Sequence, residues 1–160
     1  AEIASWADTE PTEDVMSELI FSIKAHSGSA TRTDVQARGF SIVVDEPPSL
    51  GGNDAGPNPV EYLLAALAGC INVVGHLVAR EMGFELRALD MELEGALNPA
   101  RFLNTSTEER AGYKAVDVRL TVDADADQQT LAEWARAVEA RCPVSDNIGH
   151  ATPVRLTVAK

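Results

Sequence analysis

One stretch of the sequence constrains the fold more than any other: an apolar run that follows a glycine-rich approach and extends to Met82. Asn58 is a good N-cap, because its side chain can accept from an unpaired backbone N–H. Pro59 then takes the first helical position, where its missing N–H costs nothing. Glu61 stands at the capping-box position, three residues after the cap. The residues beyond leave almost no polar face, so we predict a central helix covered on most sides by other structure.

This run could also be considered as a membrane span. Its unbroken apolar part is shorter than the ~20 residues that hydrocarbon requires, and Asn72, His76 and Arg80 interrupt or follow it. We therefore expect no membrane partner.

The 160 residues suffice for one domain with its own core. A formal charge of −12 repels phosphate backbones, so no nucleic-acid partner is expected either.

The remaining chain predicts an α+β fold. Residues 1–14 form a weakly patterned acidic arm, and residues 15–160 form a single domain. Alternating or β-branched runs predict strands, helical spacing predicts a second helix, and a long loop covers 98–113. The expected order is β-β-β-α-β-β-α-β, with strands at 15–26, 31–37, 40–44, 89–94, 116–122 and 154–158, and helices from 59 and at 129–141.

Two cysteines are too few for a disulfide framework or a four-cysteine zinc site. Cys70 lies within the central helix, and helical spacing places Cys142 on the buried stripe of the second helix. Two such helices commonly pack on one side of a sheet, so contact between the sulfurs is plausible. The pair fits a peroxide-reducing thiol and its resolving partner. Buried free cysteines are common in proteins, so two ordinary core residues are the alternative interpretation.

The settings of the two cysteines suggest different roles. Cys142 at a helix C-terminus is the poorer nucleophile, because the helix dipole disfavours negative charge there, which suits a resolving thiol. Apolar surroundings raise the pKa of Cys70 unless a cation is near, and Arg38 and Arg32 are the candidates. Glu61 lies ~13 Å along the helix axis from Cys70 and cannot touch it. It is either a cap or a residue that orients an arginine.

No metal or cofactor is expected. The three histidines match no recognised ligand spacing with the cysteines. Gly51, Gly52 and Gly56 are interpreted as a flexible lip to a pocket, not as a phosphate-binding loop. No secretory signal pattern is present, so the cytoplasm is the expected location.

Two motifs carry a resemblance to a known family. The run Gly-Pro-Asn-Pro-Val-Glu-Tyr-Leu-Leu-Ala-Ala-Leu-Ala-Gly-Cys at 56–70, together with Cys-Pro-Val-Ser at 142–145, resembles the OsmC/Ohr family of osmotically inducible and organic-hydroperoxide-resistance proteins. The resemblance implies an intertwined α+β homodimer with active sites at the subunit interface. It also implies that Cys70 attacks an organic hydroperoxide, that Cys142 resolves it as a disulfide, and that a dithiol such as lipoamide reduces the disulfide.

The family's peroxidases carry a glutamate ten residues before the reactive cysteine, where this sequence has Val60, with Glu61 one step later. This difference keeps other hypotheses open. The main alternative is a non-catalytic protein that binds a small apolar ligand at the dimer interface. A third hypothesis is a dimer with a structural role only.

Overall fold

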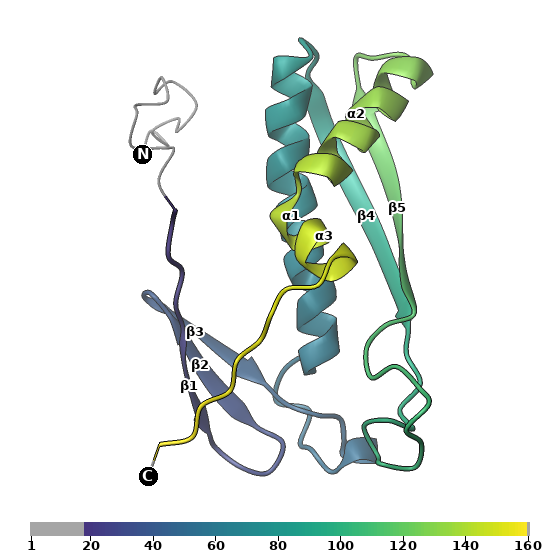
Figure 1. The fold of residues 1–160 in the computed structure, drawn as a ribbon. Coiled ribbons are helices and arrows are strands. Elements are labelled where there is room, and N and C mark those ends of the chain that lie inside the picture. Colours follow the sequence, from purple (N-terminus) through teal and green to yellow (C-terminus); the bar gives the residue numbers. More distant parts are fainter. Residues whose placement is uncertain (1–17, 160) are drawn as a thin grey trace. The chain divides into compact units, whose positions relative to one another are not determined.

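A computed structural model describes residues 18–159, so the acidic arm at 1–14 lies outside the described residues. The chain divides into two compact units, Ala1–Pro57 and Asn58–Lys160, each with an antiparallel sheet of its own (Figure 1). The α+β class and the antiparallel pairing are as predicted.

The first unit is a three-stranded meander, as predicted. It consists of β1 (Lys24–Ser27), β2 (Thr33–Ala37) and β3 (Phe40–Val44) in the order β1-β2-β3. The first strand is shorter than the predicted 15–26, because the turn at Gly28 pairs Ser27 with Thr33 and β2 ends four residues later, at Ala37. Residues 18–23 have no ladder partner in the described chain, and Ile20 is 93% exposed.

A buried carboxylate organises the loop that follows β3. Asp45 is fully buried and accepts hydrogen bonds from the backbone N–H groups of Glu46, Asn53 and Ala55, at 2.9, 3.1 and 3.2 Å. At Gly52, an added Cβ would lie 1.8 Å from the carbonyl oxygen of Glu46. This glycine therefore permits a close backbone approach, and the expected flexible lip is instead a tightly bonded loop that includes a short 3₁₀ helix, η3 (Pro48–Leu50).

The central helix of the second unit begins and ends as predicted. It is α1 (Pro59–Glu81), and Asn58 and Glu61 form the capping box through Oδ1 and Oε2, at 2.9 and 2.8 Å. Gly83 follows the C-terminus with φ +80°, the left-handed conformation that favours glycine. These local signals fix the helix ends independently of the rest of the fold.

The length argument against a membrane span was wrong for α1. By length and composition alone, this helix of 23 residues is long and apolar enough to cross a membrane. A core helix passes the same test, and α1 packs Leu67, Ile71, Val74 and Val78 into the core of its unit. Its opposite face stays exposed within the described chain, with Val73 56% exposed, so the predicted cover is incomplete.

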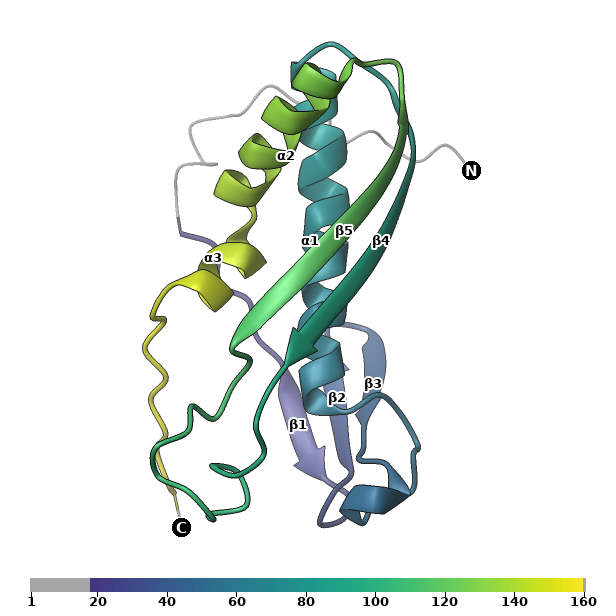
Figure 2. The same ribbon diagram turned by 90° about the vertical axis from the view of Figure 1, so that its right-hand side faces the viewer.

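A long hairpin packs along α1. It pairs β4 (Leu86–Ala96) with β5 (Ala115–Ala124), and Met91 lies opposite Leu120 (Figure 2). Inward residues such as Leu89 and Val122 pack against the core, whereas most outward positions are charged. The connection between the strands is the irregular loop that the sequence predicts.

The C-terminal part departs from the predicted order. The helix α2 (Gln128–Arg141), capped by Asp127, is followed by a helix α3 (Pro143–Gly149) where a turn was predicted. The predicted strand at 154–158 was wrong: this segment forms no ladder, and its alternating apolar residues are exposed, with Leu156 at 93%. Alternation gives a segment its strand pattern, but a strand also needs a neighbour, and the described chain offers none.

Candidate active site

Cys70 lies at the border between the two faces of α1. Successive helical residues turn by about 100°, so Cys70 falls between the buried stripe of Leu67, Ile71 and Val74 and the exposed positions Gly69 and Val73. Its side chain is half-buried and packs against the core. A reagent can therefore approach this sulfur from the open face, while the core supports it from behind.

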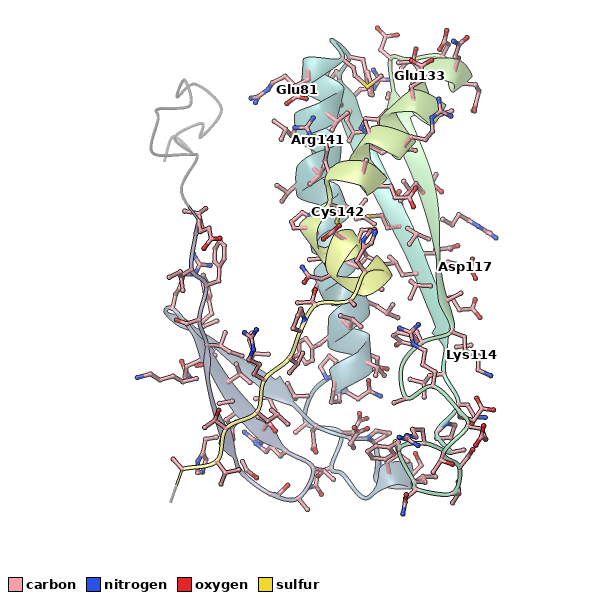
Figure 3. All side chains as sticks on the ribbon, in the orientation of Figure 1. Glu81, Lys114, Asp117, Glu133, Arg141 and Cys142 are labelled. Carbon is pink, nitrogen blue, oxygen red and sulfur yellow. The ribbon has the colours of Figure 1, made fainter. Side chains whose placement is uncertain are left out.

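Cys142 lies where α2 passes into α3, as Figure 3 shows. It is 1% exposed, which agrees with its predicted place on the buried stripe. Its backbone is extended, and its Sγ accepts from the N–H of Ser145 at 3.4 Å as the N-cap of α3. The argument that Cys142 faces only a helix C-terminus was therefore incomplete, because a second helix begins there with Pro143 at its first position.

The structure brings the two cysteines together. Both are free thiols, and the Cys142 side chain lies near enough to that of Cys70 to influence its ionisation. Burial raises the pKa of the Cys70 thiol, and the Cys142 thiol raises it further, while the backbone N–H of Val144 acts in the opposite direction. The site is thus a pair of adjacent sulfurs beside the first turn of α3.

Two anchors hold α2, and with it Cys142, against α1. The indole N–H of Trp134 donates to the carbonyl oxygen of Gly75 at 2.8 Å in the buried core. The guanidinium of Arg141 forms an ion pair with Glu81 at the end of α1 (Figure 3). Both contacts link residues about sixty positions apart, and neither follows from sequence periodicity. The only signal for Trp134 was its position beside the apolar stripe.

The carboxylate of Glu61 is bound within the capping box, as described above, which confirms the capping prediction. The neighbouring carbonyl oxygen of Val60 accepts from the hydroxyl of Tyr113 at 3.0 Å. Burial raises the pKa of Tyr113, and the charge of Glu61 adds to the effect. Sequence reasoning missed Tyr113, whose loop shows no periodicity. The role of Glu61 toward an arginine stays a prediction.

Both candidate arginines belong to the first unit, and each has a local contact there. Arg32 pairs with Asp34 at 2.7 Å, and the guanidinium of Arg38 lies over the ring of Phe40 at 5.1 Å. Arg38 also adopts a positive φ of 55° in the turn between β2 and β3. A role for either arginine beside the thiolate stays a prediction.

A pocket of about 560 Å³ opens in the second unit on the side of α1 that faces the core. Apolar side chains from four elements form most of its wall, and Cys142 belongs to this wall whereas Cys70 does not. Arg110, Tyr113 and Lys114 of the long loop line it as well. Among residues 18–159, no group of histidine, cysteine and carboxylate side chains is arranged to hold a metal ion.

Comparison with known proteins assigns the family. The family model described as OsmC-like protein matches residues 51–157, which include both cysteines. The chain belongs to the OsmC family. No curated protein sequence matches it.

Solved structures of OsmC and Ohr proteins share the fold. An OsmC-like protein from Mycoplasma pneumoniae has a TM-score of 0.72 at 19% identity, covering 83% of this chain and 89% of that one. An organic hydroperoxide resistance protein OsmC from Legionella pneumophila has a TM-score of 0.59 at 24% identity, covering 82% and 90%. The organic hydroperoxide resistance protein OhrB of Bacillus subtilis has a TM-score of 0.54 at 20% identity, covering 80% and 89%. At these identities the likeness establishes the fold, and function has to be argued from the site.

Proposed function

We propose that this OsmC-family protein is a thiol peroxidase that reduces organic hydroperoxides through Cys70 and Cys142. The observation that carries the proposal is the contact between the two free thiols, one half-buried at an open helix face and the other in the core. Such a pair suits a reaction in which one thiol attacks the peroxide and the other then forms a disulfide with the oxidised sulfur. The apolar neighbours favour organic peroxides over hydrogen peroxide. Relatives named for organic hydroperoxide resistance share this fold.

The reaction takes two steps. The Cys70 thiolate attacks the distal peroxide oxygen, the O–O bond breaks, and the alkoxide takes a proton and leaves as the alcohol, which converts Cys70 to a sulfenic acid. Cys142 then attacks the Cys70 sulfur, a disulfide forms, and the hydroxyl leaves as water. A dithiol of the lipoamide kind returns the pair to thiols.

A free-thiol count with intact mass tests this proposal directly. One equivalent of cumene hydroperoxide should remove both thiols and lower the mass by about 2 Da, the two hydrogens lost on disulfide formation. Cys142→Ser should stop at a sulfenic acid on Cys70, about 16 Da heavier. Cys70→Ser should not react. Retention of both thiols in the wild-type protein would contradict the proposal.

We also propose that the protein works as a homodimer. The support is apolar surface that the described chain leaves in water: Phe21 and Ile20 in the segment before β1, and Leu156 and Val158 after α3. Extended apolar segments without a partner strand are not stable in solution, and strands of a second copy would pair with them.

Light scattering would measure the mass in solution, where twice 17.1 kDa is expected. Leu156→Asp should shift the population toward monomer, whereas the matched change Leu103→Asp in the long loop should not. A wild-type monomer at micromolar concentration would contradict the dimer.

Two observations favour a second candidate function, a binding protein for a small apolar ligand. The pocket of about 560 Å³ lies within the usual range for small-molecule sites, and the raised pKa of Cys70 works against a reactive thiolate. In that case the thiol count stays unchanged with hydroperoxide, and a fluorescent fatty acid analogue binds with saturation.

A further inference from the structure

The first turn of α3 offers its backbone donors to the two sulfurs. Pro143, at the first position of this helix, has no N–H, so the first donors come from Val144 and Ser145. The N–H of Ser145 donates to Sγ of Cys142 at 3.4 Å. Burial raises the pKa of Cys70, and the N–H of Val144 opposes this effect. The start of α3 is therefore bound to groups whose chemistry changes when the pair is oxidised.

Apart from this cap, α3 is weakly held. The helix is seven residues long and none of its residues is fully buried, although Val144 and Ile148 pack against the core. Helices this short are not stable in water without caps and packing. Beyond the helix, the hydroxyl of Thr152 donates to Oδ1 of Asn147 at 2.7 Å, and residues 153–159 form no ladder with any residue that the structure describes. Loss of the cap would therefore affect the helix and the segment bonded to it.

Resting on the disulfide of the peroxidase function proposed above, we propose that α3 is a redox-sensitive element, which loses its cap and loosens when Cys70 and Cys142 form their disulfide. In the reduced protein, Sγ of Cys142 is free to face the N–H of Ser145. In the disulfide, the second bond of this sulfur fixes its direction toward Cys70. The oxidised pair also holds no thiolate that the N–H of Val144 could stabilise. Reduction restores the cap.

The oxidation balances with either of two oxidants. Each thiol gives up its hydrogen, one S–S bond forms, and two electrons and two protons pass to the oxidant. A hydroperoxide is thereby converted to an alcohol and water, and diamide is converted to its hydrazine. Diamide reacts first with the half-buried Cys70, and the buried Cys142 then displaces it, so the second sulfur does not have to meet the reagent.

Amide hydrogen exchange in the two redox states tests the proposal. The disulfide is made with diamide, so that this experiment does not depend on peroxide activity. Exchange at Ser145 and Asp146 should be about fivefold faster in the oxidised protein, the usual effect of a lost cap. Exchange at Thr130, whose N–H is bonded to Asp127 at 2.8 Å in the first turn of α2, should be the same in both states. Equal or slower exchange at Ser145 after oxidation, or failure of diamide to link the two sulfurs, would overturn the proposal.

Two variants separate loss of the cap from other effects of the oxidant. Cys70→Ser leaves Cys142 without a partner and only 1% exposed, so diamide should leave exchange at Ser145 unchanged. Cys142→Ala, kept reduced, lacks the cap without any disulfide, and its exchange at Ser145 should match that of the oxidised wild type. If it matched that of the reduced wild type instead, the cap would not hold the helix and the proposal would be wrong.

The two proposals fail in different ways. If hydroperoxide leaves the thiols intact while the diamide-made disulfide speeds exchange in α3, the peroxidase function fails and the redox-sensitive helix stands. If hydroperoxide forms the disulfide but exchange in α3 does not change, the peroxidase function stands and the redox-sensitive helix fails.

Discussion

The indole of Trp134 donates its N–H to the carbonyl oxygen of Gly75 at 2.8 Å, and its ring lies so close to that glycine that a side chain there would have to displace it. An added Cβ would lie 3.0 Å from Cζ2 of the ring, and Trp134 is only 1% exposed. The glycine thus stands within α1 where the indole from α2 packs against it. The hydrogen bond and the missing side chain together set the distance between the helices that carry the two sulfurs.

Gly75→Ala tests this contact. The better helix propensity of alanine contributes about 1 kcal/mol, but overpacking against a rigid ring costs about 1–3 kcal/mol, so the free energy of unfolding should fall. Trp134→Phe should lower it by about 1–3 kcal/mol, because the indole hydrogen bond to the Gly75 carbonyl is lost and the smaller ring fills less of the core. When Gly75→Ala is combined with Trp134→Phe, the alanine meets a smaller ring and should stabilise. Urea unfolding followed by circular dichroism measures all four proteins, and strict additivity would contradict this account.

Cys142 caps α3, which predicts a difference between two substitutions of the same residue. Cys142→Ser keeps an acceptor for the Ser145 N–H, whereas Cys142→Ala removes it and should cost about 1 kcal/mol of local stability. Under reducing conditions, amide exchange at Ser145 should be about fivefold faster in the alanine variant. Asp127→Ala is the control, because it should accelerate exchange only in the first turn of α2. Equal exchange in the serine and alanine variants would rule out the cap.

Asp45 gives the first unit a pH dependence of known sign. Burial alone would raise the pKa of Asp45, but hydrogen bonds from the backbone of Ala55, Glu46 and Asn53 and from Thr31 outweigh it and hold the pKa below its usual range. Because the pKa of Asp45 is lower in the folded protein than in the unfolded chain, its ionised carboxylate stabilises the fold at pH values above the unfolded pKa of about 3.9. This stabilisation is lost as the pH falls through the pKa of the folded state.

Asp45→Asn isolates that contribution from the other carboxylates. The difference in urea midpoint between wild type and variant should be constant from about pH 7 to pH 5 and shrink below about pH 4. If the difference in urea midpoint grew as the pH fell, folding would have to raise the pKa of Asp45, which would contradict this prediction.

Gly95 faces Tyr113 across the hairpin, and an added Cβ would lie 2.8 Å from Cδ1 of the ring. Gly95→Ala should displace the ring, break its hydrogen bond to the Val60 carbonyl and cost about 1–3 kcal/mol. The pKa of Tyr113, raised by burial and by Glu61, should then return toward the ordinary value. Ultraviolet titration of the phenol, with Tyr113→Phe subtracted to remove Tyr62, measures the change. An unchanged titration would show that the ring stays in place.

Features that depend on neighbouring residues could be predicted from the sequence. The capping box of Asn58 and Glu61 uses residues three positions apart, and the stripe that buries Cys142 uses helical spacing alone. The two strands of the hairpin could be predicted from the strict alternation of apolar and polar residues. This alternation arises because one face of the hairpin packs on the core and the other faces water.

Features that depend on distant partners could not be predicted. The segment at Val154 and Leu156 alternates like a strand, yet a ladder needs a second strand that periodicity does not supply. The helix α3 was missed because its cap is a cysteine, which is not among the residues that usually cap helices. The Trp134–Gly75 bond and the pocket beside Cys142 arise from the packing of α1 on α2 and β5, which no single stretch encodes.

The loop around Asp45 shows that a glycine can be required for an ordered backbone and not only for a flexible one. Gly52 stands in the loop so that two backbone segments can touch, and the buried carboxylate then fixes the chain on both sides of it. A loop frozen in this way has already lost its conformational entropy when the protein folds. Whatever molecule meets that edge therefore finds a preformed surface, and its binding does not have to order the loop first.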